Sequence, residues 1–308
     1  MFDSLWVEKY RPHKLEELVL KDEGLRIVNK FASDNEIPNL LLAGSPGVGK
    51  TTLAKILVKD VLQCQYQYIN ASDENGIDTI RSKVVQFAQT RSFDGNIKVV
   101  ILDECDGLSQ DAQRALRNTM EEYASVTRFI LTANYNHRII PALQSRCQSL
   151  DLTPPLDGCV ARVQHILKCE GINVKNNDES KIELLIKGCY PDLRRIINEL
   201  QKSCNSDKTL SIVDDAKNKK FVSTIFELVR KGAVLKLRTV IIQNEEKFGS
   251  DYPMLLRQLF DYTDTSNLHD EQKKLYLVAI AEALYRSAFV ADQEINCYSC
   301  LIQLANIR

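Results

Sequence analysis

The stretch Gly44-Ser45-Pro46-Gly47-Val48-Gly49-Lys50-Thr51 decides the fold of the first half of the chain. A short apolar run, Leu40–Ala43, precedes it, and residues 52–58 follow with apolar side chains at helical spacing. A glycine-rich turn between a buried strand and a helix lets backbone N–H groups converge on a phosphate chain, toward which the helix turns its positive end. In such a loop Lys50 reaches the β- and γ-phosphates, and the Thr51 hydroxyl ligates Mg²⁺. The sequence therefore predicts a nucleoside triphosphate site made by Gly44–Thr51 and the adjoining Thr52.

Length and composition place the chain among ordinary globular proteins. Its 308 residues suffice for about two or three domains, and 44% of them are hydrophobic and 26% charged. The formal net charge of -1 gives no general attraction to nucleic acid or membranes, so such binding needs a local patch. Nine cysteines fit reduced thiols better than a disulfide framework. The start, Met1-Phe2-Asp3-Ser4, lacks a basic n-region followed by an apolar run, and no run approaches the ~18 apolar residues of a membrane span. We expect a cytoplasmic protein.

Strand and helix patterns alternate along the first half. Apolar runs at residues 40–43, 66–70, 98–103 and 128–133 read as strands, and amphipathic segments separate them. Near-continuous apolar strands that alternate with helices indicate a parallel sheet covered on both faces. We predict an α/β domain over residues 1–153, with residues 1–38 mostly polar. Two of its helices are expected to begin at the N-caps Asp78 and Ser109, the first burying Ile80, Val84, Phe87 and Ala88 and the second Ala112, Leu116 and Met120.

Beyond Pro154-Pro155 only helical patterns remain. A small helical domain over residues 154–210 is predicted, and a third, all-helical domain over residues 211–308. Polar residues at 205–218 read as the linker between them. In the second domain we expect helices at 160–169 ended by Gly171, at 181–187 ended by Gly188, and at 191–200. In the third we expect them at 221–230, 233–243, 252–260, 270–290 and 295–307.

Two acidic residues stand at the end of the apolar run 98–103: Asp103 is its last residue, and Glu104 follows it. Asp103 and Glu104 stand at the carboxyl end of a strand, where open α/β sheets bind ligands. Asp103 can complete the Mg²⁺ shell with Thr51, and Glu104 can orient or deprotonate an attacking water. The alternative is a pair of acids that turns the chain out of a strand, but the phosphate loop upstream favours the catalytic interpretation. Asn134 ends the next strand and would lie beside the pair, although a plain turn asparagine fits there equally well.

Two arginines could reach a phosphate from outside the loop. The buried stripe of the helix at 191–200 puts Arg194 at its flank, where it can face a cleft between domains. Arg146 follows residues 141–145 on a loop before the last strand of the sheet. Because a surface arginine is often merely solvated, the residues alone leave both roles open.

These motifs carry a family resemblance over nearly the whole chain, which resembles a sliding-clamp loader ATPase of the AAA+ class. It is similar to the small subunits of replication factor C, and the run Ser92-Phe93-Asp94-Gly95 is most similar to the ATPase subunit of T-even-like phage clamp loaders. The resemblance implies a P-loop AAA+ module, a helical lid, and a helical collar through which subunits assemble into a ring. It rests on the phosphate loop together with residues 6–12, 70–73, 103–106, 113–117, 132–134 and 145–147.

The resemblance also implies roles for single residues. Gly44–Thr51 matches the Walker A motif and Asp103-Glu104 the Walker B acids. The sensor asparagine matches Asn134, the lid arginine Arg194, and the arginine finger of a neighbouring subunit Arg146. The lid motif usually has glycine where this chain has Pro191, a departure that puts the placement of Arg194 in question.

Further residues are implicated by the same resemblance in nucleotide and DNA binding. The segment from Trp6 to Pro12, with Tyr10 and Arg11, resembles the one that closes over adenine. Arg81, Arg114 and Arg117 match helix positions that track the DNA backbone, whereas the residues alone would suggest solvated charges.

The function implied is that of an ATPase subunit that opens or holds a ring clamp at primer-template DNA and releases both upon hydrolysis. Phosphate contact without base readout suits loading at any sequence. The expected cofactors are ATP and Mg²⁺. The expected partners are the sliding clamp, DNA and the other subunits of a ring-like hetero-oligomer that contains several copies of this chain. If the chain is phage-encoded, the expected location is the cytoplasm of a bacterial host. Alternatives are another AAA+ motor, such as a branch-migration helicase or replication initiator, and a non-hydrolysing scaffold subunit.

Overall fold

The structure is a computed structural model. It describes residues 5–73, 76–90, 97–174, 178–205, 208–210, 215–245, 248 and 251–307, except for the side chains of residues 79, 81 and 215–219. The chain divides into two compact units, Met1–Ile212 and Val213–Arg308. Each unit is built around hydrophobic clusters of its own residues.

A five-stranded sheet forms the centre of the first unit. Its strands lie in the order β2-β3-β4-β1-β5, and every neighbouring pair is parallel. The register pairs Asn70 with Asp103 and Ala43 with Ala133, so the carboxyl ends of these four strands meet at one edge. The strands are β1 (Leu40–Ala43), β2 (Tyr66–Asn70), β3 (Lys98–Asp103), β4 (Thr127–Ala133) and β5 (Gln148–Ser149).

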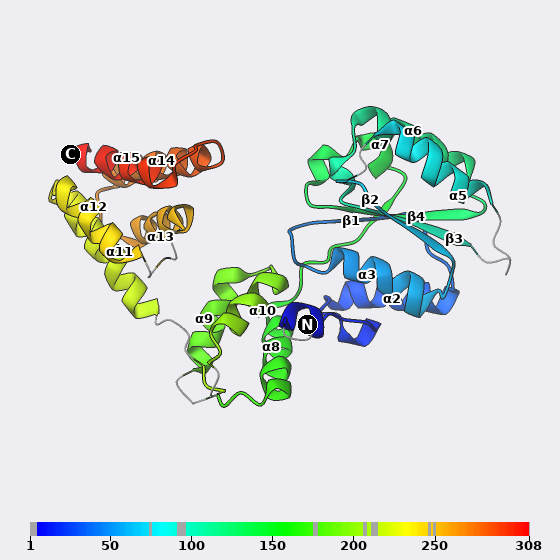
Figure 1. Cartoon of the computed structure of the whole chain (residues 1–308), viewed down its shortest axis with the longest axis horizontal. Coiled ribbons are helices and arrows are strands. Elements are labelled where there is room, and N and C mark those ends of the chain that lie inside the picture. Colours follow the sequence, from blue (N-terminus) through cyan, green and yellow to red (C-terminus); the bar gives the residue numbers. More distant parts are fainter. Residues whose placement is uncertain are drawn as a thin grey trace. The chain divides into compact units, whose positions relative to one another are not determined.

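Helices cover both faces of this sheet, as predicted (Figure 1). Successive strand residues point to opposite faces, so Leu42 and Ile101 pack with helices α2 and α3, and Leu102 packs with α6 on the other side. Because both faces are buried, the strands need apolar residues at nearly every position. The helical segments of this domain are α2 (Asp22–Asp34), α3 (Lys50–Ile56), η3 (Leu57–Val61), α4 (Ile77–Thr79), η4 (Ile80–Val84), α5 (Val85–Gln89), η5 (Cys105–Gly107), α6 (Gln110–Glu122), η6 (Asn136–Arg138) and α7 (Pro141–Gln144).

Of the two predicted N-caps, Ser109 is confirmed and Asp78 is wrong. Ser109 caps α6 by accepting the N–H of Ala112, and the predicted stripe of α6 is buried. Asp78 is not an N-cap, because α4 already begins at Ile77 after Gly76. An acidic residue is favourable within the first helical turn as well as at the cap, so Asp78 could not distinguish the two positions.

Residues 1–38 contain more structure than their polar composition indicated. Short segments α1 (Trp6–Lys9) and η2 (Leu15–Glu17) precede α2, whose buried residues Gly24, Val28 and Phe31 lie on one face. One of these three contact positions is a glycine, so the apolar stripe is weak in the sequence. Trp6 packs into the core of the helices that follow the sheet, so α1 is joined to them rather than to the sheet.

Three helices follow the sheet: α8 (Leu156–Glu170), α9 (Glu179–Cys189) and α10 (Leu193–Lys202). Helix α8 ends as predicted, because Gly171 adopts the left-handed conformation with φ 66°. The predicted end of α9 was wrong, since the helix continues through Gly188. It ends at Cys189 because the next residue, Tyr190, precedes a proline and is extended, with ψ 138°.

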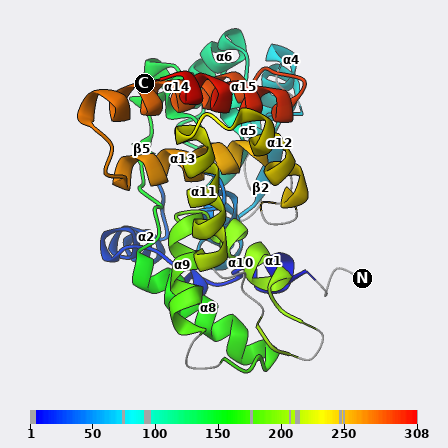
Figure 2. The same cartoon turned by 90° about the vertical axis from the view of Figure 1, so that its left-hand side faces the viewer.

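The second unit is helical throughout its described residues. Its helices are α11 (Asp215–Arg230), α12 (Val234–Gln243), α13 (Tyr252–Thr265), α14 (Asp270–Ser287) and α15 (Gln293–Asn306). Helices α14 and α15 lie side by side (Figure 2). Cys297 and Cys300 are buried in its core. The predicted linker 205–218 was too long, because α11 already begins at Asp215.

None of the helices in the described ranges is both long and apolar enough to cross a lipid bilayer. The first unit holds both the sheet and the three helices after it. The division into domains 1–153, 154–210 and 211–308 therefore stays a prediction.

We predict that residues 211–308 fold as an isolated fragment, because their core is built from their own side chains. Far-UV circular dichroism should show a helical spectrum and a cooperative thermal transition. Ile280→Ala, at a fully buried position of α14, should cost about 2–5 kcal/mol of unfolding free energy. Leu275→Ala on the same helix, where the side chain is 54% exposed, should change it by less than about 0.5 kcal/mol. A random-coil spectrum would show that the fragment depends on the first unit.

Candidate nucleotide-binding site

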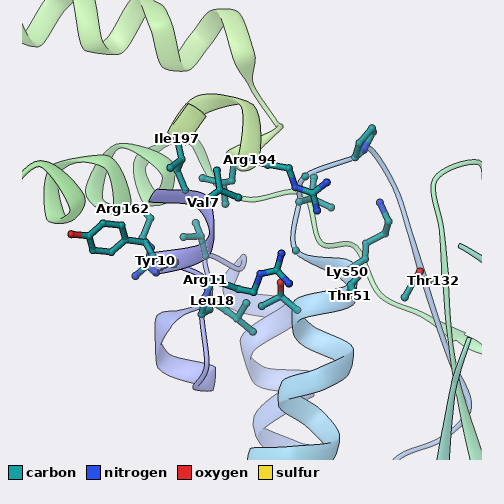
Figure 3. Close-up of a pocket in the computed structure, with 18 of the residues that line it drawn as sticks. Val7, Tyr10, Arg11, Leu18, Lys50, Thr51, Thr132, Arg162, Arg194 and Ile197 are labelled. Carbon is teal, nitrogen blue, oxygen red and sulfur yellow. Dashed lines mark hydrogen bonds between the residues drawn. The ribbon is translucent and has the colours of Figure 1, made fainter. Parts of the chain in front are cut away.

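A pocket opens at the carboxyl edge of the sheet (Figure 3). Three parts of the first unit line it: the N-terminal segment, the phosphate loop with the ends of β3 and β4, and the helices α8 and α10. Its lining residues are Val7, Tyr10, Arg11, Pro12, Glu17, Leu18, Val19, Pro46, Gly47, Val48, Gly49, Lys50, Thr51, Thr52, Asp103, Glu104, Thr132, Asn134, Arg162, Leu193, Arg194 and Ile197.

The backbone of the phosphate loop needs glycine at two of these positions. Gly47 and Gly49 have φ 73° and 97°, a backbone conformation that residues other than glycine rarely adopt. A Cβ atom on Gly49 would meet no atom within 4 Å, so the loop leaves open space there. A Cβ atom on Gly47 would instead lie 1.7 Å from Asp192 Oδ1. The residue before α10 therefore rests directly on the loop.

Lys50 lies inside the loop and is only 8% exposed. Its Nζ donates to the carbonyl oxygens of Gly44 and Ser45, both at 2.8 Å. Burial lowers the pKa of Lys50 below its ordinary value, and the carboxylates of Asp106 and Asp103 oppose that shift. The ammonium group is thus held where an anion in the loop would compensate its lost hydration.

The Asp103 carboxylate is held by three hydroxyl groups. Oδ1 accepts from Thr51 Oγ1 at 2.7 Å and from Thr132 Oγ1 at 2.6 Å, and Oδ2 accepts from Tyr68 Oη at 2.7 Å. The pKa of Tyr68 is raised, first by burial and then by its hydrogen bond to Asp103, so the phenol keeps the proton that it donates. Thr51 and Asp103, the two predicted metal ligands, are therefore in direct contact.

These groups fit a magnesium–nucleotide complex. The loop offers a buried ammonium, an open backbone turn and a helix N-terminus, the features that bind phosphate chains. Mg²⁺ prefers oxygen ligands and usually takes one or two protein oxygens together with phosphate oxygens and water. The described residues contain no group of three or more His, Cys, Asp or Glu side chains able to hold a metal. Thr51 and Asp103 offer two protein oxygens of the kind that Mg²⁺ takes.

Glu104 and Asn134 line the same pocket. Glu104 is exposed and has left-handed backbone geometry, with φ 55°, and its N–H donates to Thr132 Oγ1 at 2.9 Å. The backbone N–H of Asn134 donates to Asp106 Oδ1 at 3.3 Å. The structure thus brings these two predicted residues to one place, with the Glu104 carboxylate accessible from the pocket.

The two predicted phosphate-binding arginines differ in position. Arg194 lines the pocket from α10 (Figure 3). Helix α10 starts normally after Pro191, because Asp192 Oδ1 accepts the N–H of Arg195 at 2.9 Å. Arg146 is absent from the described lining of the pocket.

Arg146 instead pairs with a carboxylate on the same domain. Its guanidinium donates to Glu121 on α6 and, through Nη1, to the Ala142 carbonyl at 2.8 Å. The side chain remains partly exposed, at 34%. Within this chain it therefore has no contact with the pocket.

Tyr10 and Arg11, the predicted adenine-site residues, both line the pocket. The Tyr10 hydroxyl points away from the phosphate loop (Figure 3) and donates to Glu170 Oε1 at 2.6 Å. Burial and this bond raise the pKa of Tyr10 to about 12. Arg11 pairs with Glu8. The N-terminal segment thus supplies a wall on the side of the pocket where α8 and α10 lie.

The predicted DNA-binding arginines lie outside the pocket lining of the described residues. Arg114 on α6 is exposed and pairs with Asp111, and Arg117 donates to its neighbour Asn118. Arg81 belongs to η4, which packs against α6, and its side chain is outside the described part of the structure.

Among the residues to which the sequence analysis gave no role at the site are Tyr68, Thr132, Arg162 and Asp192. Thr132 could have been found, since it lies on the strand that neighbours the one ending in Asp103, directly after the apolar run 129–131 and two residues before Asn134. Asp192 had the signal of an N-cap before a helical pattern. Tyr68 and Arg162 gave no local signal, because their contacts span long distances in the chain.

Comparison with known proteins shows to which family the chain belongs. The model of the ATPase family associated with various cellular activities (AAA) matches residues 40–154. The chain is 36% identical to the replication factor C small subunit of Thermofilum pendens over 99% of its own length and 97% of the relative's. It is 38% identical to that of Staphylothermus marinus, over 98% and 95%, and 33% identical to that of Methanococcus vannielii, over 97% and 98%.

Solved structures agree on the fold. The Thermotoga maritima RuvB Holliday junction branch migration motor superposes with a TM-score of 0.56 at 16% identity, covering 95% of this chain and 90% of RuvB. At that identity the likeness concerns the fold alone. On the near full-length sequence likeness and the intact nucleotide site, this chain belongs to the AAA ATPases of the replication factor C small subunit family.

Proposed function

We propose that this chain is the ATP-hydrolysing subunit of a sliding-clamp loader. ATP binding opens or holds the ring clamp at primer-template DNA, and hydrolysis releases it. The observation that supports this most is the pocket in which Lys50, Thr51, Asp103, Glu104 and Arg194 converge, in a chain that matches replication factor C small subunits along nearly its whole length.

Nucleotide binding is assigned to the loop and the walls around it. Backbone N–H groups of Gly44–Thr51, with Thr52, hold the phosphate chain, and Lys50 neutralises its outer charge. Thr51 and Asp103 hold the magnesium ion. Such an ion would supply positive charge to offset the negative charge that develops on the phosphate oxygens. Tyr10 and Arg11 stand on the side where the base would lie.

Hydrolysis is assigned to the residues at the mouth of the pocket. Glu104 orients a water molecule and accepts its proton, and Asn134 positions that water or the terminal phosphate. Arg194 approaches the terminal phosphate from α10. Arg146 leaves Glu121 and enters the site of a neighbouring subunit, since it does not reach the pocket of its own chain.

The assembly proposed is a ring-like hetero-oligomer with several copies of this chain. Residues 1–153 and 154–210 form the AAA+ module and its lid, and residues 211–308 form the collar that joins the subunits. Arg81, Arg114 and Arg117 contact DNA phosphates, with no base readout, in the central channel. The relatives compared above are archaeal. The run at 92–95, on which the phage likeness rests, lies outside the described residues.

Two other functions have less support. A branch-migration motor shares the fold, but the sequence likeness is to replication factor C along the whole chain. A non-hydrolysing scaffold subunit would have no need of the complete set Lys50, Thr51, Asp103 and Glu104, which the structure brings into one pocket.

Glu104→Gln tests the hydrolytic site. The amide can orient water but cannot accept its proton, so turnover should fall about 10²- to 10⁴-fold while ATP binding is kept. Lys50→Ala should lose binding as well. The readouts are phosphate release and titration with a fluorescent ATP analogue, with exposed Glu122→Gln on the same domain as control. Turnover at the wild-type rate in Glu104→Gln would refute the assignment of Glu104.

Arg146→Ala tests whether sites are shared between subunits. A guanidinium supplied in trans is worth on the order of 10³–10⁵ in rate. The variant should bind ATP normally as an isolated subunit, yet the assembled complex should lose most of its turnover. A mixture with Glu104→Gln subunits should regain activity only at interfaces that pair an intact Arg146 with an intact Glu104. Normal turnover of the Arg146→Ala complex with clamp and primed DNA would remove the arginine-finger role.

Neutralising Arg114 or Arg117 tests the DNA surface. Binding of the complex to primed DNA should weaken equally for all sequences, and the slope of log K against log salt should flatten by about one unit per residue. Basal ATP turnover should be unchanged. Fluorescence anisotropy at several salt concentrations measures both quantities. An effect limited to one DNA sequence, or none on any, would place these arginines outside the channel.

A further inference from the structure

A tyrosine on the edge strand reaches the carboxylate at the centre of the nucleotide site. Tyr68 lies on β2, which pairs with β3, and its hydroxyl donates to Asp103 Oδ2 at 2.7 Å. The pocket lining includes Thr51, Thr132 and Asp103, but Tyr68 is not among its described residues. Tyr68 therefore contacts the site through Asp103 and not through the space that a nucleotide would fill.

The hydrogen bonds leave one orientation available to the Asp103 carboxylate. Each carboxylate oxygen can accept about two hydrogen bonds. Thr51 and Thr132 take both positions of Oδ1, at 2.7 and 2.6 Å. Tyr68 takes one position of Oδ2. Among the described residues no other donor contacts Oδ2, so its remaining position is the one left for a magnesium ion, and the phenol decides which side of Oδ2 that is.

The phenol ring is itself held in place. Lys55, on α3, has its Nζ 4.6 Å from the centroid of the ring. One part of the ring is open to solvent, since Tyr68 is 37% exposed, while its hydroxyl end lies against Asp103. The ring thus bridges the helix after the phosphate loop and the strand that ends in Asp103, the two elements that carry the proposed metal-binding residues.

We propose that Tyr68 is a positioning residue for magnesium, which fixes the Asp103 carboxylate in the orientation that supports Mg²⁺ beside Thr51. The inference rests on the Mg²⁺–ATP site proposed above and adds to it a residue from a strand with no other part in the pocket. Groups that hydrogen-bond a metal-binding carboxylate typically contribute 10- to 100-fold to metal affinity.

The test separates positioning from a merely structural role. Tyr68→Phe removes the hydroxyl and keeps the ring under Lys55. Tyr66→Phe is the matched control, because Tyr66 lies two residues earlier on the same face of β2 and has Lys59 Nζ 5.9 Å from its ring centroid. Binding of a fluorescent ATP analogue to the full-length chain is titrated with Mg²⁺, starting from excess EDTA. Thermal unfolding without nucleotide checks that both variants are folded.

Tyr68→Phe should bind the analogue without Mg²⁺ as tightly as the wild type, and the Mg²⁺ concentration for half-maximal enhancement should rise about 10-fold. Tyr66→Phe should leave it unchanged. An equal shift in both variants, or none in Tyr68→Phe, overturns the inference while the proposed function stands. If the wild type binds the analogue with no dependence on Mg²⁺, both are overturned. Should Tyr68→Phe unfold at a lower temperature than the wild type, the titration is run on both proteins well below that temperature, where both are folded, and an unchanged Mg²⁺ requirement of Tyr68→Phe there overturns the inference.

Discussion

The parallel pairing of the strands is the constraint on which the site depends. Strands that run in one direction end at one edge of the sheet, so Asn70, Asp103, Ala133 and Ala43 come together there although they are far apart in the sequence. Polar residues can follow each strand at that edge without disturbing the buried faces. The phosphate loop after β1 and the acidic pair at the end of β3 are thereby placed side by side, and hydroxyls from α3 and β4 meet on one carboxylate.

The fold of the first domain was predictable because burial on both faces leaves a clear pattern. Residues such as Val100 and Ile101 pack on opposite sides of the sheet, so the run has to be apolar throughout. The loop, Asp103, Glu104 and Asn134 were predictable for a related reason, since each stands next to such a run. Helix ends were harder: Gly188 is an ordinary helical residue here, and the adjacent Tyr190-Pro191 stops the helix instead.

The parts of the site that could not be predicted depend on contacts between distant segments. Tyr68 reads locally as one more aromatic strand residue, and only the pairing of β2 with β3 brings its hydroxyl to Asp103. The wall of the pocket near Tyr10 also depends on contacts between distant segments. It is fixed by Arg162, which donates to the Tyr10 carbonyl at 2.7 Å, and by Gln201, which accepts the Trp6 N–H at 3.0 Å. No periodicity within residues 6–10 indicates these partners.

The contact between Gly47 and Asp192 has a consequence for which sequences the chain can tolerate. Position 47 needs glycine for two reasons. Its backbone has a positive φ angle, and the Asp192 carboxylate occupies the volume that a Cβ atom would fill. A substitution that relieved the first requirement would still push against the cap of α10, and with it the helix that carries Arg194. A residue other than glycine at position 47 would therefore require the Asp192 side chain to leave its cap on α10, so positions 47 and 192 constrain each other although they lie far apart in the sequence.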